Sequence, residues 1–133
     1  MSKSMLYAVN TADQTIDAGG SVMFTEIIRQ TGNSIKLRSG HVETEEAGYY
    51  HVAVNLTIQP AAASAVTAQI LLNNNPVPGA VASLTPGAIN EAGSVCIPCI
   101  VRTYGCPMAE PSVLTVEISG DCTVTNATVE VVH

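Results

Sequence analysis

The sequence predicts an all-β sandwich or barrel, and three observations favour this class. Residues 48–58 read GYYHVAVNLTI, in which large apolar residues alternate with smaller or polar ones. A period of two directs alternate side chains to opposite faces, so this segment is predicted to be a long strand with one buried face. No segment carries a helical stripe over three turns. Turn-forming Gly, Asn and Pro recur at short intervals, which is typical of many short strands.

The same pattern predicts the other elements in chain order. We expect strands over residues 7–10, 14–17, 22–28, 34–37, 41–44, 49–58, 66–72, 81–84, 94–104, 113–119 and 123–132. No linker or repeat divides the chain, so residues 1–133 are expected to form a single domain. The last strand ends in a β-rich run, and we expect it at the centre of a sheet, where it would protect against an open edge.

Composition points to self-association. Hydrophobic residues make up 47% of the 133 residues, but there is no Trp and only one Phe, so the core is expected to consist of Val, Ile, Leu and Ala. Charged residues make up 12%, against about 25% in an ordinary soluble domain. A lone domain with so few charges would expose much uncharged surface, which a contact between identical copies would cover.

The charge of the chain disfavours two classes of partner. The net charge is −6, and the five basic residues form no run. Nucleic acids and anionic membranes both select for basic patches, so neither is expected as a partner. The chain contains no apolar run long enough to cross a bilayer, and its start lacks the apolar core of an export signal. We therefore expect synthesis and folding in a cytoplasm.

The four cysteines, Cys96, Cys99, Cys106 and Cys122, lie in the last third of the chain. Cys96 and Cys99 have CxxC spacing, which suits a redox or zinc pair. Their flanks are strand-like, however, and the other two cysteines stand apart, so buried thiols are favoured over a disulfide or a metal site. Their pairing and redox state stay open.

Catalytic chemistry is not indicated. His41 and His51 could each pair with one of the nearby carboxylates of Glu43, Glu45 and Glu46, but those glutamates lie around a predicted solvated turn. The chain has no nucleophile elbow and no phosphate-binding loop. We therefore predict no enzyme activity, no catalytic residues, no metal site and no cofactor.

Two segments are candidates for binding. Residues 73–79 form the most polar turn, so Asn73, Asn74, Asn75 and Pro76 are candidates for an exposed binding loop, although a plain hairpin connection would also explain them. Residues 1–5 are a candidate flexible or docking arm, comprising Ser2, Lys3, Ser4 and Met5 after the initial methionine.

Several of these segments resemble a known family. The chain has IKL at residues 35–37 before Gly40 and an acidic stretch, GYY at 48–50, and AQILLNN at 68–74. It closes with Gly120, Asp121 and TNATVEV at 125–131. This order resembles the tumour-necrosis-factor-like and complement-type globular heads, particularly their bacterial and phage branch, over nearly the whole chain from Leu6.

The resemblance implies an antiparallel two-sheet jelly-roll sandwich that assembles as a compact homotrimer. It also implies that the long strand near Tyr49 packs around the threefold axis. The candidate trimer-interface residues are Tyr49, Tyr50, His51, Ala53 and Asn55.

The resemblance further leads us to expect a virion structural protein. The expected function is that of a trimeric capsid decoration or head-fibre protein of a bacteriophage, made in the host cytoplasm. Its partner would be the major capsid protein or another virion protein. The alternative is a receptor- or carbohydrate-binding tip module that uses exposed loops such as 73–79.

Overall fold

The computed structural model describes residues 4–103 and 112–133, and their regular secondary structure consists of β-strands. The strands are β1 (Met5–Asn10), β2 (Gln14–Ile16), β3 (Glu26–Thr31), β4 (Ile35–Arg38), β5 (His41–Thr44), β6 (Gly48–Pro60), β7 (Val66–Leu72), β8 (Asn75–Leu84), β9 (Gly93–Thr103), β10 (Ser112–Ile118) and β11 (Cys122–Val132). The predicted strand at 94–104 thus corresponds to β9, and residue 104 lies outside the described part. No helix among the described residues is long and apolar enough to cross a membrane.

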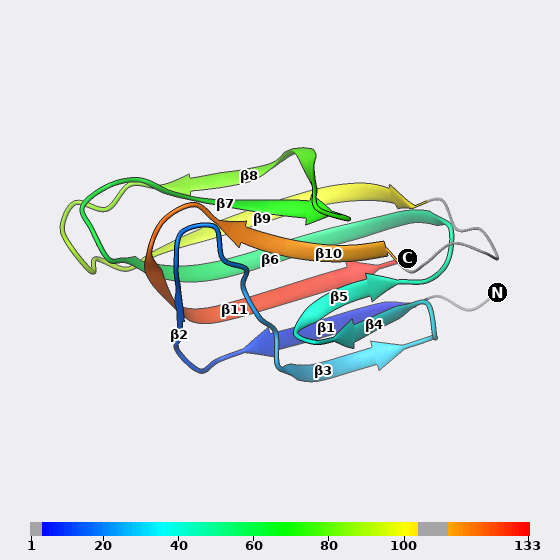
Figure 1. The fold of residues 1–133 in the computed structure, drawn as a ribbon. Helices are drawn as coiled ribbons and strands as arrows, with labels where there is room; N and C mark the ends of the chain where they lie inside the picture. The colour runs from blue at the N-terminus through cyan, green and yellow to red at the C-terminus, as the bar shows by residue number, and fades with distance from the viewer. Residues whose placement is uncertain (1–3, 104–111) are drawn as a thin grey trace.

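The strands form two layers, shown in Figure 1. Sheet A has the order β3-β1-β11-β6-β9, with β2 also paired to β11, and sheet B has the order β4-β5-β10-β7-β8. The strand pairs within the described residues are antiparallel, and the chain passes repeatedly from one sheet to the other. This arrangement is a jelly roll, which confirms the expected fold class.

The last strand lies where the sequence predicts it. β11 pairs with β1 on one side and with β6 on the other, so it occupies the centre of sheet A. The backbone N–H of His133 continues the pairing by donating to the carbonyl of Ser4 at 2.9 Å. The two ends of the described chain are therefore held together within one sheet.

Alternation along the strands builds the core between the sheets. The inward residues of β6 are each at most 1% exposed: Tyr50, Val52, Val54, Leu56 and Ile58. Across the core lie Leu114, Val116 and Ile118 of β10. Small branched side chains fit the pleated surfaces of two stacked sheets, so this core needs no Trp.

The prediction of a strand over residues 22–28 is wrong in its boundaries. Val22 and Phe24 are buried, but their segment lies outside the named strands, where Val22 N–H donates to Val116 and Phe24 N–H donates to Gly40. β3 begins only at Glu26, and its pairing with β1 contains a register shift. Val22 and Phe24 alternate with polar or exposed residues because both are buried in the core, and this alternation resembles a strand although the segment has no continuous strand pairing.

The predicted turn at 73–79 is also corrected. Only Asn73 and Asn74 connect β7 to β8, and both have positive φ, 51° and 67°, as a two-residue type I′ turn requires. Asn75 and Pro76 already belong to β8 and pair with Leu72 and Leu71. Consecutive Asn residues tolerate the left-handed conformation, so the hairpin closes earlier than the polar run suggests.

Candidate interaction site on the outer face of sheet A

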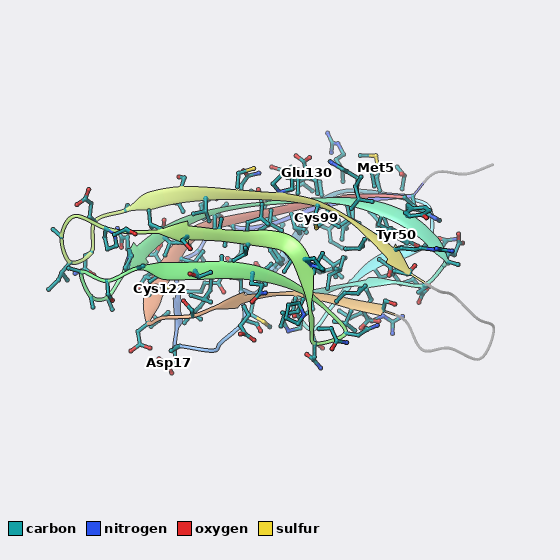
Figure 2. All side chains as sticks on the ribbon, turned by 90° about the horizontal axis from the view of Figure 1, so that it is seen from above. Met5, Asp17, Tyr50, Cys99, Cys122 and Glu130 are labelled. Carbon is teal, nitrogen blue, oxygen red and sulfur yellow. The ribbon has the colours of Figure 1, made fainter. Side chains whose placement is uncertain are left out.

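The outer face of sheet A presents side chains in rows that cross the strands. One row contains Ile100, His51, Val132 and Met5, from β9, β6, β11 and β1 in that order. The next row contains Pro98, Ala53, Glu130 and Tyr7. Figure 2 shows Met5 and Glu130 on the same side of the molecule. The strand register therefore brings residues from distant parts of the sequence onto one surface.

Large apolar side chains gather at one end of this face. Ile100 is 65% exposed, Val132 42% and Met5 40%, all within the same row. Next to them, Tyr49 is 63% exposed, and the guanidinium carbon of Arg102 lies 5.5 Å from the centre of its ring. We call the row of Ile100, His51, Val132 and Met5, together with the adjacent Tyr49, the apolar row. Exposed apolar side chains that are contiguous in this way mark interaction surfaces.

The rest of the same face carries few charges. The row below Ala53 contains Cys96, Asn55 and Thr128, and a further row contains Ser94, Thr57 and Asn126. Small uncharged side chains lose little by leaving water if they find partners, whereas buried charges cost far more. A partner could therefore cover these two rows without burying a charge.

Four of the five predicted interface residues lie on this face. Tyr49, His51 and Asn55 are exposed, and Ala53 is partly buried. Tyr50 is the exception: its side chain is 0% exposed and lies in the core, on the other side of β6. Including Tyr50 with its neighbours was therefore wrong, because adjacent residues in a strand point to opposite faces. Sequence analysis also missed Ile100 and Val132, which only the strand register aligns with His51.

Tyr50 instead belongs to a partly buried polar cluster near the start of β6. Its hydroxyl donates to the carbonyl oxygen of Glu46 at 2.7 Å, and the hydroxyl of Thr103 donates to the same oxygen at 2.8 Å. The ring of Tyr50 stacks on His133, with centroids 4.3 Å apart. Burial is the main cause that raises the pKa of the Tyr50 hydroxyl. Figure 2 shows Tyr50 among the strands at the end of the sandwich.

Gly48 makes room for this stack. Its φ is +140°, and a Cβ added there would lie 2.7 Å from Nε2 of His133. A larger residue would therefore displace the imidazole. The glycine that opens the long strand is thus explained by the approach of the last residue.

The same cluster resembles a catalytic triad in composition but not in geometry. Nδ1 of His133 lies 3.3 Å from Oγ of Ser34 and 3.9 Å from Oε2 of Glu46. A catalytic base contacts its nucleophile through one ring nitrogen and its orienting carboxylate through the other. Here both partners approach the same nitrogen, so this arrangement does not activate Ser34.

The two histidines weighed for catalysis lie elsewhere. His51 is on the outer face of sheet A and His41 is on the outer side of sheet B, so the fold does not bring them together. In residues 4–103 and 112–133, neither forms an ion pair with a carboxylate. That part of the chain also contains no group of three His, Cys, Asp or Glu suited to hold a metal ion.

The CxxC pair is split between the two faces of β9. Cys96 is exposed on the outer face, whereas Cys99 is half-buried against the core. Residues three apart in a strand point to opposite sides, so the two thiols do not face each other. Cys122 is buried, and burial raises the pKa of its thiol and of the Cys99 thiol. The expectation of buried thiols therefore fits Cys122 but not Cys96, and Cys106 lies outside the described residues.

Two of the predicted loop residues, Asn73 and Asn75, form hydrogen bonds within the fold. Oδ1 of Asn73 accepts the backbone N–H of Val113 at 2.8 Å, and Nδ2 of Asn75 donates to the carbonyl of Asn73 at 3.3 Å. Asn73, Asn75 and Pro76 line a groove of about 500 Å³ that also includes Ile100 and Arg102 of β9. Asn74 is the exposed tip of the hairpin.

Part of the predicted N-terminal arm belongs to the sandwich. Ser4 is 4% exposed, and its Oγ accepts the backbone N–H of Ser34 at 3.3 Å. Met5 is the first residue of β1. Assigning these two residues to a free arm was wrong, because sheet pairing and the contact with Ser34 hold them. Ser2 and Lys3 lie outside the described residues.

Comparisons with known proteins identify the fold without naming a function. No protein-family model and no curated protein matches the chain significantly. Among solved structures, murine APRIL matches with a TM-score of 0.77 at 10% identity, covering 98% of both chains. The Eiger TNF from S. frugiperda matches with a TM-score of 0.72 at 14% identity, covering 98% of this chain and 90% of that one. The fold is therefore that of tumour-necrosis-factor-like jelly rolls.

One similar structure comes from a virus particle. The vertex protein P5 of phage PRD1 matches with a TM-score of 0.59 at 10% identity, covering 97% of this chain and 94% of that one. Identity at this level shows a shared jelly-roll fold and nothing finer.

Proposed function

We propose that the protein is a structural component of a bacteriophage particle. In this proposal a homotrimer decorates the capsid or forms part of a head fibre, and it acts by binding and assembly rather than by catalysis. The observation that carries the proposal is the exposed apolar row on the outer face of sheet A. The major capsid protein or another virion protein is the proposed partner.

The apolar row supports the contact between copies. A stable interface buries about 800 Å² on each partner and has an apolar centre with a polar rim. The apolar row supplies such a centre, and Ala53, Asn55 and Thr128 supply uncharged surroundings. We therefore place the trimer contact at Tyr49, His51, Ala53 and Asn55, together with Ile100. Threefold symmetry is what the family resemblance implies.

The location in a virion has separate support. The PRD1 vertex protein shares the fold, so a jelly roll of this kind occurs in a phage particle. Small trimers also suit the threefold positions that capsid lattices offer. We propose that residues 1–3, which include Ser2 and Lys3, contribute to docking on the capsid.

The mass in solution tests the trimer. We expect light scattering to give about threefold the chain mass of 13.8 kDa at micromolar concentration. Ile100→Glu places a charge in the apolar row and should yield a monomer, because a buried unpaired charge is costly. Val81→Glu is the matched control, since Val81 is 48% exposed but lies on β8 of sheet B. A monomeric wild-type protein, or equal behaviour of both variants, would contradict the proposed contact.

Analysis of virus particles tests the location. Particles purified after induction of the bacterium that carries the gene should contain the chain in high copy by quantitative mass spectrometry. A chain that lacks residues 1–3 should keep the trimer mass and lose binding to particles. Finding the chain in the cell extract but not in purified particles would reject the virion role while leaving the trimer intact.

A further inference from the structure

A hollow of about 700 Å³ opens on the outer face of sheet B, on the side of the sandwich opposite the apolar row. Its base lies on β10, where Leu114, Val116 and Ile118 are buried while Thr115 and Glu117 point outward. The size lies within the range of small-molecule sites. Neither the proposed trimer contact nor the capsid contact uses this hollow.

We call this hollow the sheet B hollow. Two segments form its walls. On one side, Ser21 forms an antiparallel bridge with Glu117, and the neighbouring Val22 N–H donates to Val116 at 2.8 Å. On the other side stands the hairpin turn with Asn74 at its tip. The hairpin is held to β10 by Asn73, whose backbone N–H donates to the Val113 carbonyl and whose Oδ1 accepts the Val113 N–H. Both walls are thus fixed to β10, so the hollow exists before any ligand arrives.

The floor of the hollow contains an apolar residue in an outward position. Leu71 follows the buried Ile70 in β7 and lies opposite Thr115 across the sheet. It lies outside the core cluster, yet it is only 8% exposed. Leu71 is therefore largely covered by its neighbours, so recognition of a ligand depends on the polar groups that line the hollow.

The carboxylate of Glu117 is available to a ligand. It is partly buried, lines the hollow, and forms no ion pair within residues 4–103 and 112–133. A carboxylate accepts several hydrogen bonds and can bind two neighbouring hydroxyl groups at once.

His41 supplies a donor. Its Nδ1 is buried and has no hydrogen-bond partner in the described structure. His41 lines the hollow and its Nδ1 is shielded, so Nε2 is the ring nitrogen that we assign to a ligand oxygen.

The charges around the hollow disfavour an anionic ligand. Among the residues that the structure describes, no Lys or Arg lines it. On the same sheet, Lys36 lies 3.2 Å from Glu45, and Arg38 lies 3.6 Å from Glu43, so these cations are already paired. A ligand with many neutral hydroxyl groups matches the mixture of carboxylate, imidazole, amide and hydroxyl groups better than a phosphate or a carboxylate does.

We propose that the sheet B hollow binds a neutral saccharide unit. Glu117 accepts hydrogen bonds from adjacent hydroxyl groups, while His41 Nε2 and the Asn74 amide donate to ligand oxygens. This site would let a particle-bound trimer attach to a glycosylated surface, but the binding itself does not depend on the trimer or on the capsid contact.

A glycan array probed with the labelled full-length protein tests the proposal. The array should include neutral, sialylated and amino-sugar glycans, and the strongest neutral ligand is then titrated by calorimetry. We expect Glu117→Gln to weaken binding about tenfold or more, because hydrogen bonds to a charged group are stronger than neutral ones. His41→Phe should weaken binding in the same direction. Val81→Ala, on the same sheet but outside the hollow, should change the affinity less than about twofold.

Asn74→Gly provides a second test in case His41→Phe disturbs the fold. Glycine adopts the positive φ of this position without strain, so the variant removes the amide and preserves the turn. It should weaken binding several-fold with an unchanged circular dichroism spectrum. Absence of binding to neutral glycans overturns the proposal. Binding restricted to anionic or amine glycans, or affinities unchanged in both Glu117→Gln and Asn74→Gly, also overturns it. A monomeric protein that still binds would reject the trimer and leave this site standing.

Discussion

At the scale of single residues, Tyr50 attaches sheet A to the connection that comes from sheet B, through one carbonyl oxygen. Glu46 lies in the connection from β5 in sheet B to β6 in sheet A, and both Tyr50 and Thr103 donate to its carbonyl. The ring of His133 covers Tyr50 from the side of the last strand. A core with few aromatic residues thus places one of them where the sheets join.

Tyr50→Phe tests this hydrogen bond. Removing the hydroxyl leaves the Glu46 carbonyl with Thr103 alone, so we expect a loss of about 1 kcal/mol in the free energy of unfolding. Urea unfolding followed by circular dichroism measures the loss. Tyr49→Phe is the control, because Tyr49 is 63% exposed and its change should be within about 0.5 kcal/mol. Equal losses in the two variants would contradict the assigned role.

Burial of the same hydroxyl predicts a response to alkaline pH. The pKa of Tyr50 is raised from 10.0 in the folded protein, so above pH 10 the unfolded chain loses its proton more readily than the folded one. The contribution of Tyr50 is therefore complete below that pH and is lost as pH rises. Cys99 and Cys122, raised from 9.0, add a loss of the same sign that begins near pH 9.

The urea midpoint should accordingly decline from pH 8 to pH 11. Tyr50→Phe should decline less than the wild-type protein above pH 10, although it starts from a lower value. A parallel decline of both proteins over this interval would show that Tyr50 ionisation does not contribute.

At the scale of elements, the β7–β8 hairpin illustrates how two adjacent asparagines can have different roles. Both adopt positive φ, but only Asn73 accepts the N–H of Val113 with its side chain. This bond attaches the hairpin to the start of β10. The tip at Asn74 is left to solvent, next to the sheet B hollow.

Asn73→Ala should destabilise the protein by about 2 kcal/mol. The substitution removes a hydrogen bond and also forces alanine into the left-handed region, and each effect costs about 1 kcal/mol. Asn74→Gly should be neutral or slightly stabilising, because glycine suits the second position of the turn. Thermal and urea unfolding measure both variants. A larger loss for Asn74→Gly than for Asn73→Ala would contradict this assignment.

At the scale of the whole molecule, the sandwich has two different outer faces. Sheet A carries the apolar row, with Tyr49 and Ile100 more than 60% exposed. Sheet B carries the ion pairs of Lys36 and Arg38 and the hollow near Glu117. Assembly through sheet A would leave sheet B directed outward, where a ligand could reach it.

If assembly stabilises the fold, the melting temperature depends on concentration. We expect a rise of roughly 3 °C or more for each tenfold increase in protein, because association favours the folded state by mass action. Differential scanning fluorimetry over two decades of concentration measures this effect. Ile100→Glu should abolish the dependence, and Val81→Glu should retain it. A wild-type melting temperature that is independent of concentration would argue against assembly.

The sequence by itself determined the fold class and most elements, because alternation is a local property that survives without knowledge of contacts. The parity of Tyr50, Val52 and Val54 was enough to predict one buried face of β6. The start of β3 was missed because the burial of Phe24 depends on partners outside its segment. The start of β8 was missed because the two-residue turn at Asn73 and Asn74 lies inside a longer polar run. Only the tertiary structure decided the surfaces. Ile100, His51, Val132 and Met5 become neighbours through strand register. Leu71, His41 and Glu117 belong to three different strands, β7, β5 and β10, and line the same hollow. Register depends on pairing between distant segments, and no local pattern specifies it.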